Sequence, residues 1–168
     1  MSVGALPAPD PGVGGVQGSY DGTGLRLAVV TTRWNNHLTG RLLVGARRAY
    51  AHCNVAHESV TEVWCPGAFE LPLVCLQLAS SGEYDAVIAL GAVVRGETTH
   101  YEMVSEAAAV GVRRASEATG VPVIFGVMTT ETEEQVMERS GDGESNKGFE
   151  AVTTAVEMAT LLRQLPGA

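Results

Sequence analysis

The sequence of 168 residues is poor in aromatic side chains and in cysteine, and both shortages restrict what the protein can be. Aromatic residues make up only 5% of a chain that is 45% hydrophobic, so alanine, valine and leucine must form most of its core. The three cysteines, Cys53, Cys65 and Cys75, include no C-x-x-C pair. Because an odd number of cysteines is no disulfide framework, we expect reduced core thiols in a cytoplasmic protein.

Motifs for cofactors, metals and membranes are also missing. No G-x-G-x-x-G follows an expected strand, no Walker sequence occurs, and no group of Cys, His, Asp or Glu has metal-ligand spacing. No apolar run is long enough to span a bilayer, and the sequence shows no signal-peptide pattern. The formal net charge of −8 disfavours general binding to nucleic acids or to an anionic membrane surface. We therefore expect no cofactor, no metal, no nucleic-acid partner and no membrane association.

The first part of the chain differs in composition from the rest. Residues 1–24 are rich in glycine and proline and contain few large apolar side chains, as expected for a mobile tail or for an arm that only a neighbour can order. Residues 25–168 are enough for one domain with a proper core and too few for two. We predict a flexible N-terminal arm followed by a single domain.

Hydrophobic periodicity within that domain alternates between strands and helices. Short runs rich in β-branched or small apolar residues predict strands over 25–31, 59–64, 85–94 and 121–128. Apolar stripes at helical spacing predict helices from Leu38 to Cys53 and over 68–81, 98–118 and 146–165, and a capping box of Thr130 and Glu133 predicts a short helix near 129–135. Such alternation is typical of a parallel sheet with helices on both faces.

Polar segments follow each expected strand. Because ligands bind at the carboxyl ends of the strands in an open α/β sheet, these segments should share one edge. They are residues 32–36, 65–70, 95–100 and 125–130. This clustering is the first indication of a functional site.

The segment 95–100 carries the clearest chemistry. Gly96 allows close approach of the backbone to a ligand, and Thr98 and Thr99 lie at an expected helix start, where free N–H groups and the helix dipole attract anions. His100 falls in the first turn of that helix and could carry protons at neutral pH. The alternative is a plain helix cap followed by an exposed histidine.

The other candidates also have structural explanations. Trp34 could form a platform for a flat heterocycle or simply pack, and Glu70 could bind hydroxyl or amine groups or favour a helix N-terminus. Arg139 and Lys147 follow the fourth expected strand at some distance, and on the residues alone a solvated surface charge is the better explanation of each. Nothing in the spacing brings these two cations to the same edge.

Four motifs together resemble the 6,7-dimethyl-8-ribityllumazine synthase family of riboflavin biosynthesis. They are PGAFELP (66–72), RGETTHYE (95–102), GVPVIFGVMTTET (120–132) and NKG (146–148), within a similarity running from about Leu25 to Leu162. The resemblance implies an α/β three-layer sandwich with a four-stranded parallel sheet in flavodoxin-like order. It also implies a cofactor-free condensation of 5-amino-6-(D-ribitylamino)uracil with 3,4-dihydroxy-2-butanone 4-phosphate, the penultimate step of the pathway, which releases phosphate and water.

The resemblance further implies roles for individual residues. His100 would carry protons, and Arg139 would bind the phosphate and stabilise it as it leaves. The substrate-binding residues would be Trp34, Asn35, Gly67, Ala68, Phe69, Glu70, Val93, Val94, Gly96, Glu97, Thr98, Phe125 and Lys147. Trp34 stands where the family commonly has phenylalanine, and Glu97 replaces a smaller or neutral residue, so only its backbone should matter. Phe125, Arg139 and Lys147 would reach the site from an adjacent subunit.

A shared site implies a homo-oligomer with a pentamer as the minimum unit and an N-terminal arm that adds to a neighbouring subunit. In the family that the sequence resembles, shell formation depends on the turn between the last two helices. The turn 140–146 here is short, contains glycine and lacks proline, so the resemblance implies a hollow shell of about sixty chains in twelve pentamers. Two other interpretations stay open: a riboflavin synthase of the related five-fold type, and a shell or scaffold protein whose site is idle. Turnover of the two named substrates would separate all three.

Overall fold

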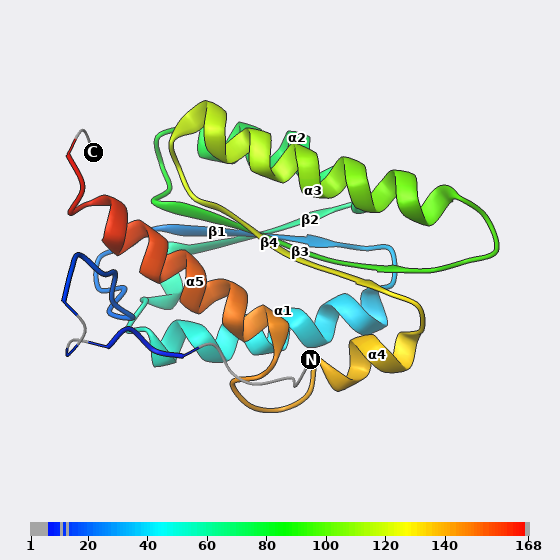
Figure 1. The fold of residues 1–168 in the computed structure, drawn as a ribbon, viewed down its shortest axis with the longest axis horizontal. Coiled ribbons are helices and arrows are strands. Elements are labelled where there is room, and N and C mark those ends of the chain that lie inside the picture. Colours follow the sequence, from blue (N-terminus) through cyan, green and yellow to red (C-terminus); the bar gives the residue numbers. More distant parts are fainter. Residues whose placement is uncertain (1–6, 11, 13, 167–168) are drawn as a thin grey trace.

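The computed structural model, which describes residues 7–10, 12 and 14–166, is built on a four-stranded parallel sheet (Figure 1). The strands are β1 (Leu27–Thr32), β2 (Val60–Cys65), β3 (Ala86–Val94) and β4 (Val123–Thr130), and their order in the sheet is β2-β1-β3-β4. The two inner strands are buried over almost their whole length, which explains their nearly continuous apolar sequences. The outer strands β2 and β4 are only partly buried.

Helices cover both faces of the sheet and produce three layers (Figure 1). One face carries α1 (Asn36–His52), α4 (Glu133–Glu138) and α5 (Lys147–Leu162), and the other carries α2 (Leu71–Ala79) and α3 (His100–Thr119). A 3₁₀ turn, η1 (His57–Ser59), precedes β2. Each face of the sheet packs against its helices through a separate apolar core. One core includes Ile88 and Leu90 of β3 and the other includes Val87 and Ala89, because successive side chains of a strand point to opposite faces. The predicted α/β three-layer sandwich is confirmed.

The predicted elements are all present, with ends that shift by a few residues, but the predicted capping box is wrong. Thr130 is the last residue of β4, where it pairs with Val94, and its hydroxyl donates to the carbonyl of Thr132 at 2.9 Å. The cap of α4 is instead Thr132, whose hydroxyl accepts from the Gln135 backbone N–H at 3.4 Å. Two T-x-x-E/Q patterns overlap here, one beginning at Thr130 and one at Thr132. Because β4 extends as far as Thr130, only the pattern that begins at Thr132 is free to cap α4.

The described part of the N-terminal arm lies against α5 of its own chain. The Ser19 N–H donates to the Thr160 hydroxyl at 2.8 Å, and the Gln164 side chain donates to the Gln17 carbonyl at 2.8 Å. A Cβ at Gly18 would lie 2.1 Å from the Glu157 carbonyl oxygen, so the arm approaches the helix backbone closely. Residues 1–6, 11 and 13 of the predicted arm lie outside the described residues. Its addition to a neighbouring subunit stays a prediction.

Candidate active site

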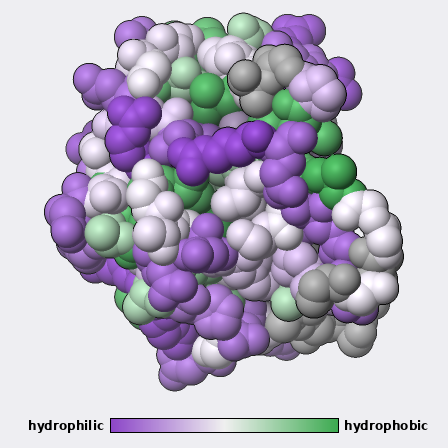
Figure 2. All heavy atoms as spheres, turned by 90° about the vertical axis from the view of Figure 1, so that its left-hand side faces the viewer, coloured by the Kyte–Doolittle hydropathy of each residue, from purple (hydrophilic) through white to green (hydrophobic). Residues whose placement is uncertain are grey.

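A cavity of about 600 Å³ opens at the carboxyl ends of β1, β2 and β3. Its lining residues come from the segments that follow these three strands and from the start of α3. They are Trp34, Asn35, Gly67, Ala68, Phe69, Glu70, Ala92, Val93, Val94, His100 and Val104. The opposite end of the sheet faces the viewer in Figure 2 and has a mainly hydrophilic surface. The cavity end instead exposes large apolar side chains, with Trp34 at 74% and Phe69 at 60%.

Main-chain hydrogen bonds tie the segment after β1 to the segment after β2. The Arg33 N–H donates to the Cys65 carbonyl at 2.9 Å, and the Trp34 N–H donates to the Pro66 carbonyl at 3.0 Å. A Cβ at Gly67 would lie 3.0 Å from Cδ1 of Trp34 and 3.1 Å from a Glu70 carboxylate oxygen. Glycine at position 67 therefore leaves room for both the indole and the carboxylate at the place that a side chain would occupy.

Asn35 joins the same segment to β3. Its backbone is left-handed, with φ of 59°, a conformation that asparagine tolerates better than most residues. Its side-chain amide donates to the Ala92 carbonyl at 2.9 Å. The Asn35 amide oxygen is left to accept from a ligand, while the amide nitrogen holds the ends of β1 and β3 in a fixed relation.

Cys65 lies beneath this wall as a structural thiol. Burial raises the pKa of the Cys65 thiol to about 11, with the nearby Glu70 carboxylate adding to the shift. Its Sγ lies 3.5 Å from the Gly67 carbonyl oxygen, to which the thiol donates. Because the thiolate is the reactive form, Cys65 is a poor nucleophile near neutral pH.

Arg95 anchors the loop that leads from β3 into α3. Its guanidinium pairs with the carboxylates of Glu102 and Glu131, the latter at 2.7 Å, and lies 4.2 Å from the ring centre of Tyr101. The backbone N–H of Arg95 donates to the Thr130 carbonyl at 2.9 Å. The hydrogen bond from Arg95 holds the pKa of Glu102 below its usual range. The positive charge of Arg95 is thus committed to two carboxylates, one on α3 and one beyond β4.

The loop held by Arg95 carries Gly96, Glu97 and Thr98, which lie between the cavity residues Val94 and His100. All three are exposed, and they are not among the residues that line the cavity. His100 is the first residue of α3, and its N–H donates to the Thr98 hydroxyl at 3.4 Å. The first turn of a long helix therefore begins directly at the cavity rim, with its free N–H groups at the loop.

Three predicted site residues lie away from this cavity. Phe125 and Lys147 line a second hollow of about 280 Å³ between the free edge of β4 and the start of α5. Arg139 ends α4, and its guanidinium donates to the Gln135 carbonyl at 3.0 Å. The structure thus brings nine of the predicted site residues together in the lining of one cavity and leaves these three on another part of the subunit.

Some cavity residues were not anticipated from the sequence. Ala92 lies two residues before Val94 on β3, and Val104 follows His100 by one helical turn, so strand and helix periodicity could have placed both. Arg95, Glu102 and Glu131 lie within two of the four sequence motifs, but no feature of the sequence assigned them a role. Among the described residues, no group of three or more His, Cys, Asp or Glu could hold a metal ion, and no helix in that part of the chain is long and apolar enough to cross a membrane.

Comparison with known families matches the model of 6,7-dimethyl-8-ribityllumazine synthase to residues 24–163, nearly the whole chain. The chain belongs to this family. The matched region begins where the N-terminal arm ends and covers every strand and helix of the fold. Membership confirms the resemblance carried by the four sequence motifs and assigns the chain to an enzyme family of riboflavin biosynthesis.

The buried thiols lead to a first prediction. Burial raises the pKa to about 11 for Cys53 and to about 12 for Cys75, as it raises that of Cys65. The thiolate form is therefore rarer in the folded protein than in free cysteine at any pH below these values. We expect iodoacetamide at pH 8 to leave all three cysteines unmodified during a period that fully labels free cysteine.

Mass spectrometry of peptides from the labelled protein checks this expectation. The same protein unfolded in guanidinium is the control and should take up three labels. Fast labelling of Cys65 in the folded protein would contradict its assignment as an inert structural thiol.

Proposed function

We propose that the chain catalyses the condensation of 5-amino-6-(D-ribitylamino)uracil with 3,4-dihydroxy-2-butanone 4-phosphate, yielding 6,7-dimethyl-8-ribityllumazine, phosphate and two waters. The observation that carries the proposal is the cavity at the carboxyl ends of β1, β2 and β3, with an exposed indole and an imidazole among its lining residues. Its volume of about 600 Å³ suits a small-molecule substrate. Family membership supports the same reaction.

The pyrimidine half of the reaction fits the wall formed after β1 and β2. The exposed Trp34 ring offers a flat apolar surface on which a uracil ring can stack. The main chain at Val93 and Val94 can read the polar edge of that ring, since main-chain N–H and C=O groups are hydrogen-bonding groups with fixed positions. Glu70 and the free amide oxygen of Asn35 can accept hydrogen bonds from the ribityl hydroxyls.

The phosphate half requires positive charge that the cavity lining does not supply. No arginine or lysine is among the described residues that line it, and the nearby Arg95 is committed to Glu102 and Glu131. The N–H groups of Gly96, Glu97 and Thr98 before α3 can bind part of a phosphate. In our proposal Arg139 and Lys147 of an adjacent subunit supply the missing charge, together with the Phe125 side chain.

An oligomer of this kind agrees with the apolar surface of the subunit. Leu73 and Met103 on the α2 and α3 face are 72% and 66% exposed, and Leu76 and Val110 are also exposed. Large exposed apolar side chains gathered on one face are typical of protein interfaces. We therefore place these helices, as well as the cavity rim, against a neighbouring subunit in a closed ring.

The chemistry of the proposed reaction needs positioning and proton transfer. Imine formation releases water, loss of the phosphate group follows proton removal from the butanone carbon chain, and ring closure releases the second water. Each step moves protons, and an imidazole at the position of His100 can both accept and donate them. Alignment of two reactive substrates supplies much of the remaining acceleration, so no cofactor is required. Three free, buried cysteines fit a protein of the cytoplasm.

Turnover of the two named substrates tests the function directly. We expect the wild-type chain to form the lumazine product, which is followed by its absorbance. His100→Ala should lower the turnover number by up to about 10²-fold with the oligomer intact, because a general acid–base group is lost. Wild-type conversion of lumazine to riboflavin would favour the riboflavin synthase alternative, and absence of any turnover would favour an idle shell.

Mixing of subunits tests whether the site is shared. Rings assembled from equal amounts of His100→Ala and Arg139→Ala chains should contain intact sites where one variant's Arg139 faces the other's normal His100. Random mixing in a heterologous ring makes about one quarter of the sites intact. We expect about 25% of wild-type activity from co-refolded mixtures and only the low activity of the single variants when they are assembled apart. Equal activities in the two preparations would contradict a shared site.

Particle mass tests the extent of assembly. We propose pentamers as the minimum unit and a shell of twelve pentamers as the complete particle. Sixty chains of 17.6 kDa give about one megadalton, against about 90 kDa for a lone pentamer. Light scattering at neutral pH should give the larger value. A species of about five chains would disprove the shell and keep the pentamer, and an active monomer would disprove both.

A further inference from the structure

The two cations that the proposed function brings to a neighbouring site are joined through the main chain. Arg139 ends α4 and Lys147 begins α5, and the loop between them returns on itself. The Lys147 N–H donates to the Arg139 carbonyl at 2.8 Å, and the Asn146 N–H donates to the Gly143 carbonyl at 3.3 Å. The relative placement of Arg139 and Lys147 therefore depends on the shape of one closed loop.

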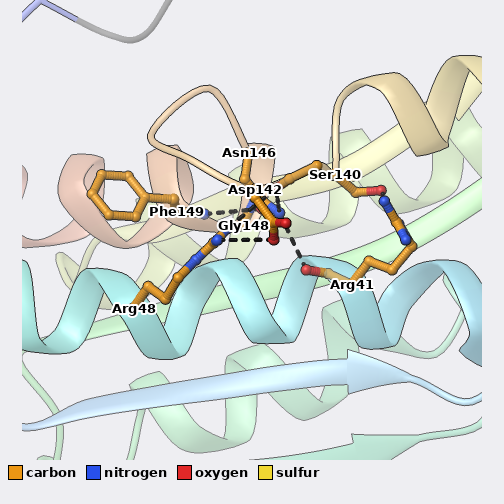
Figure 3. A network of polar contacts seen from close by, with 8 residues as sticks. Arg41, Arg48, Ser140, Asp142, Asn146, Gly148 and Phe149 are labelled. Carbon is orange, nitrogen blue, oxygen red and sulfur yellow. Dashed lines mark hydrogen bonds and ion pairs between the residues drawn. The ribbon is translucent and has the colours of Figure 1, made fainter.

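Asn146 lies at the centre of that loop and is 1% exposed (Figure 3). Its side-chain oxygen accepts from the N–H groups of Gly148 and Phe149 at 2.8 and 3.3 Å, which caps the first turn of α5. Its amide nitrogen donates to the carbonyls of Gly141 and Arg41 at 2.9 and 3.2 Å. One buried amide thus links the loop, the start of α5 and the backbone of α1, with all four of its hydrogen-bonding positions used.

The close crossing of α1 and α5 fixes the position of this amide. A Cβ at Gly45 on α1 would lie 2.0 Å from the Asn146 side-chain oxygen, and a Cβ at Gly148 would lie 1.9 Å from the Leu42 carbonyl oxygen. No side chain fits at either position while the helices stay this close. The Asn-Lys-Gly sequence therefore has a physical reason at its first and third positions, and its second position carries a lysine whose ammonium pairs with Glu150 at 2.5 Å.

Other contacts between α1 and the loop hold it less firmly. Arg41 donates to the Ser140 hydroxyl at 3.1 Å, and Arg48 donates to the Gly141 carbonyl at 3.1 Å and pairs with Asp142 at 3.1 Å (Figure 3). The Asp142 side chain is fully exposed, and exposed ion pairs contribute little stability. Because the Asn146 amide is buried, its hydrogen bonds face the least competition from water.

We propose that Asn146 is a positioning residue for the phosphate-bearing substrate: it locks the loop 139–147, so that Arg139 and Lys147 reach the adjacent subunit's site as one rigid pair. The inference rests on the proposed function. It assigns to Asn146 no contact with substrate. A loosened loop leaves both cations present but no longer held at the geometry that binds phosphate, and positioning errors of this kind carry a large cost in enzymes.

Replacing Asn146 with aspartate separates its two roles. Asn146→Asp keeps the oxygen that caps α5, and a carboxylate at a helix N-terminus is favourable. It loses the donor and places a charge against the carbonyls of Gly141 and Arg41, which opens the loop. Asn146→Ser likewise keeps a cap and, without adding charge, loses the amide nitrogen that donates to both carbonyls, so it tests the same point if the aspartate variant fails to assemble.

We expect both variants to raise the inhibition constant of inorganic phosphate and the KM of the butanone phosphate by at least about tenfold. The KM of the pyrimidine substrate should change by less than about twofold, because its binding surface lies in the other subunit. Hydrogen exchange followed by mass spectrometry should show faster exchange in peptides covering 139–147. A general loss of stability would instead affect both substrates, so this split identifies positioning.

Asn54→Asp is the matched control. Asn54 is exposed beyond the end of α1, has a left-handed backbone that aspartate also tolerates, and donates to Asp21 at 3.4 Å. The same chemical change there should leave phosphate inhibition unchanged. An unchanged inhibition constant of inorganic phosphate in both Asn146 variants, or an equal change in Asn54→Asp, would overturn the role of Asn146 and leave the proposed function standing. A wild-type protein that neither turns over substrate nor binds phosphate would overturn the proposed function, and this inference with it.

Discussion

The parallel pairing of β1 with both β2 and β3 determines where every other feature of the subunit lies. Because the three strands run in one direction, their following segments meet at one edge, and those segments form the walls of the cavity. The fourth strand pairs only with β3 and lies at the outside of the sheet. Phe125, in the middle of β4, therefore faces a different hollow from the one that the first three strands create.

Hydrogen bonds between the loops fix the relative positions of the segments that follow the strands, which the sheet alone does not fix. Asn35 fixes the end of β1 to β3, and the Trp34 N–H fixes it to the segment after β2. Arg95 joins the end of β3 to α3 and to the residues after β4. These contacts leave the Trp34 ring exposed while its backbone is held, which is the arrangement that a stacking surface requires.

The sequence predicted the architecture well because its signals are local. Apolar runs identified the strands, helical stripes identified the helices, and the rule for parallel sheets placed the polar segments at one edge. Local signals could not decide between two overlapping capping patterns, since the choice depends on how far β4 pairs with β3. They also could not show that Arg95 is neutralised by Glu102 and Glu131, or that Arg139 and Lys147 are main-chain neighbours, because these contacts depend on how the loops fold and follow no periodic pattern.

The placement of Lys147 breaks local rules for helix formation, and this points to the function of the loop. Lys147 is the only lysine in the sequence and is the first residue of α5, where the positive end of the helix dipole disfavours a cation. Gly148, a poor helix former, follows it. The Glu150 carboxylate, 2.5 Å from the Lys147 ammonium, offsets the cost of a cation at the helix N-terminus. The close approach of α1 explains why a glycine stands at position 148.

Sequences that fold well violate such rules mainly at functional sites. The substrate that we propose is phosphorylated, yet the chain has a net charge of −8 and its described cavity lining contains neither arginine nor lysine. Arg139 and Lys147, each paired with one carboxylate of its own chain, lie instead at the two ends of a locked loop on another part of the subunit. In our proposal a neighbouring subunit brings these cations to the cavity, so that binding of the anion and association of subunits become one event.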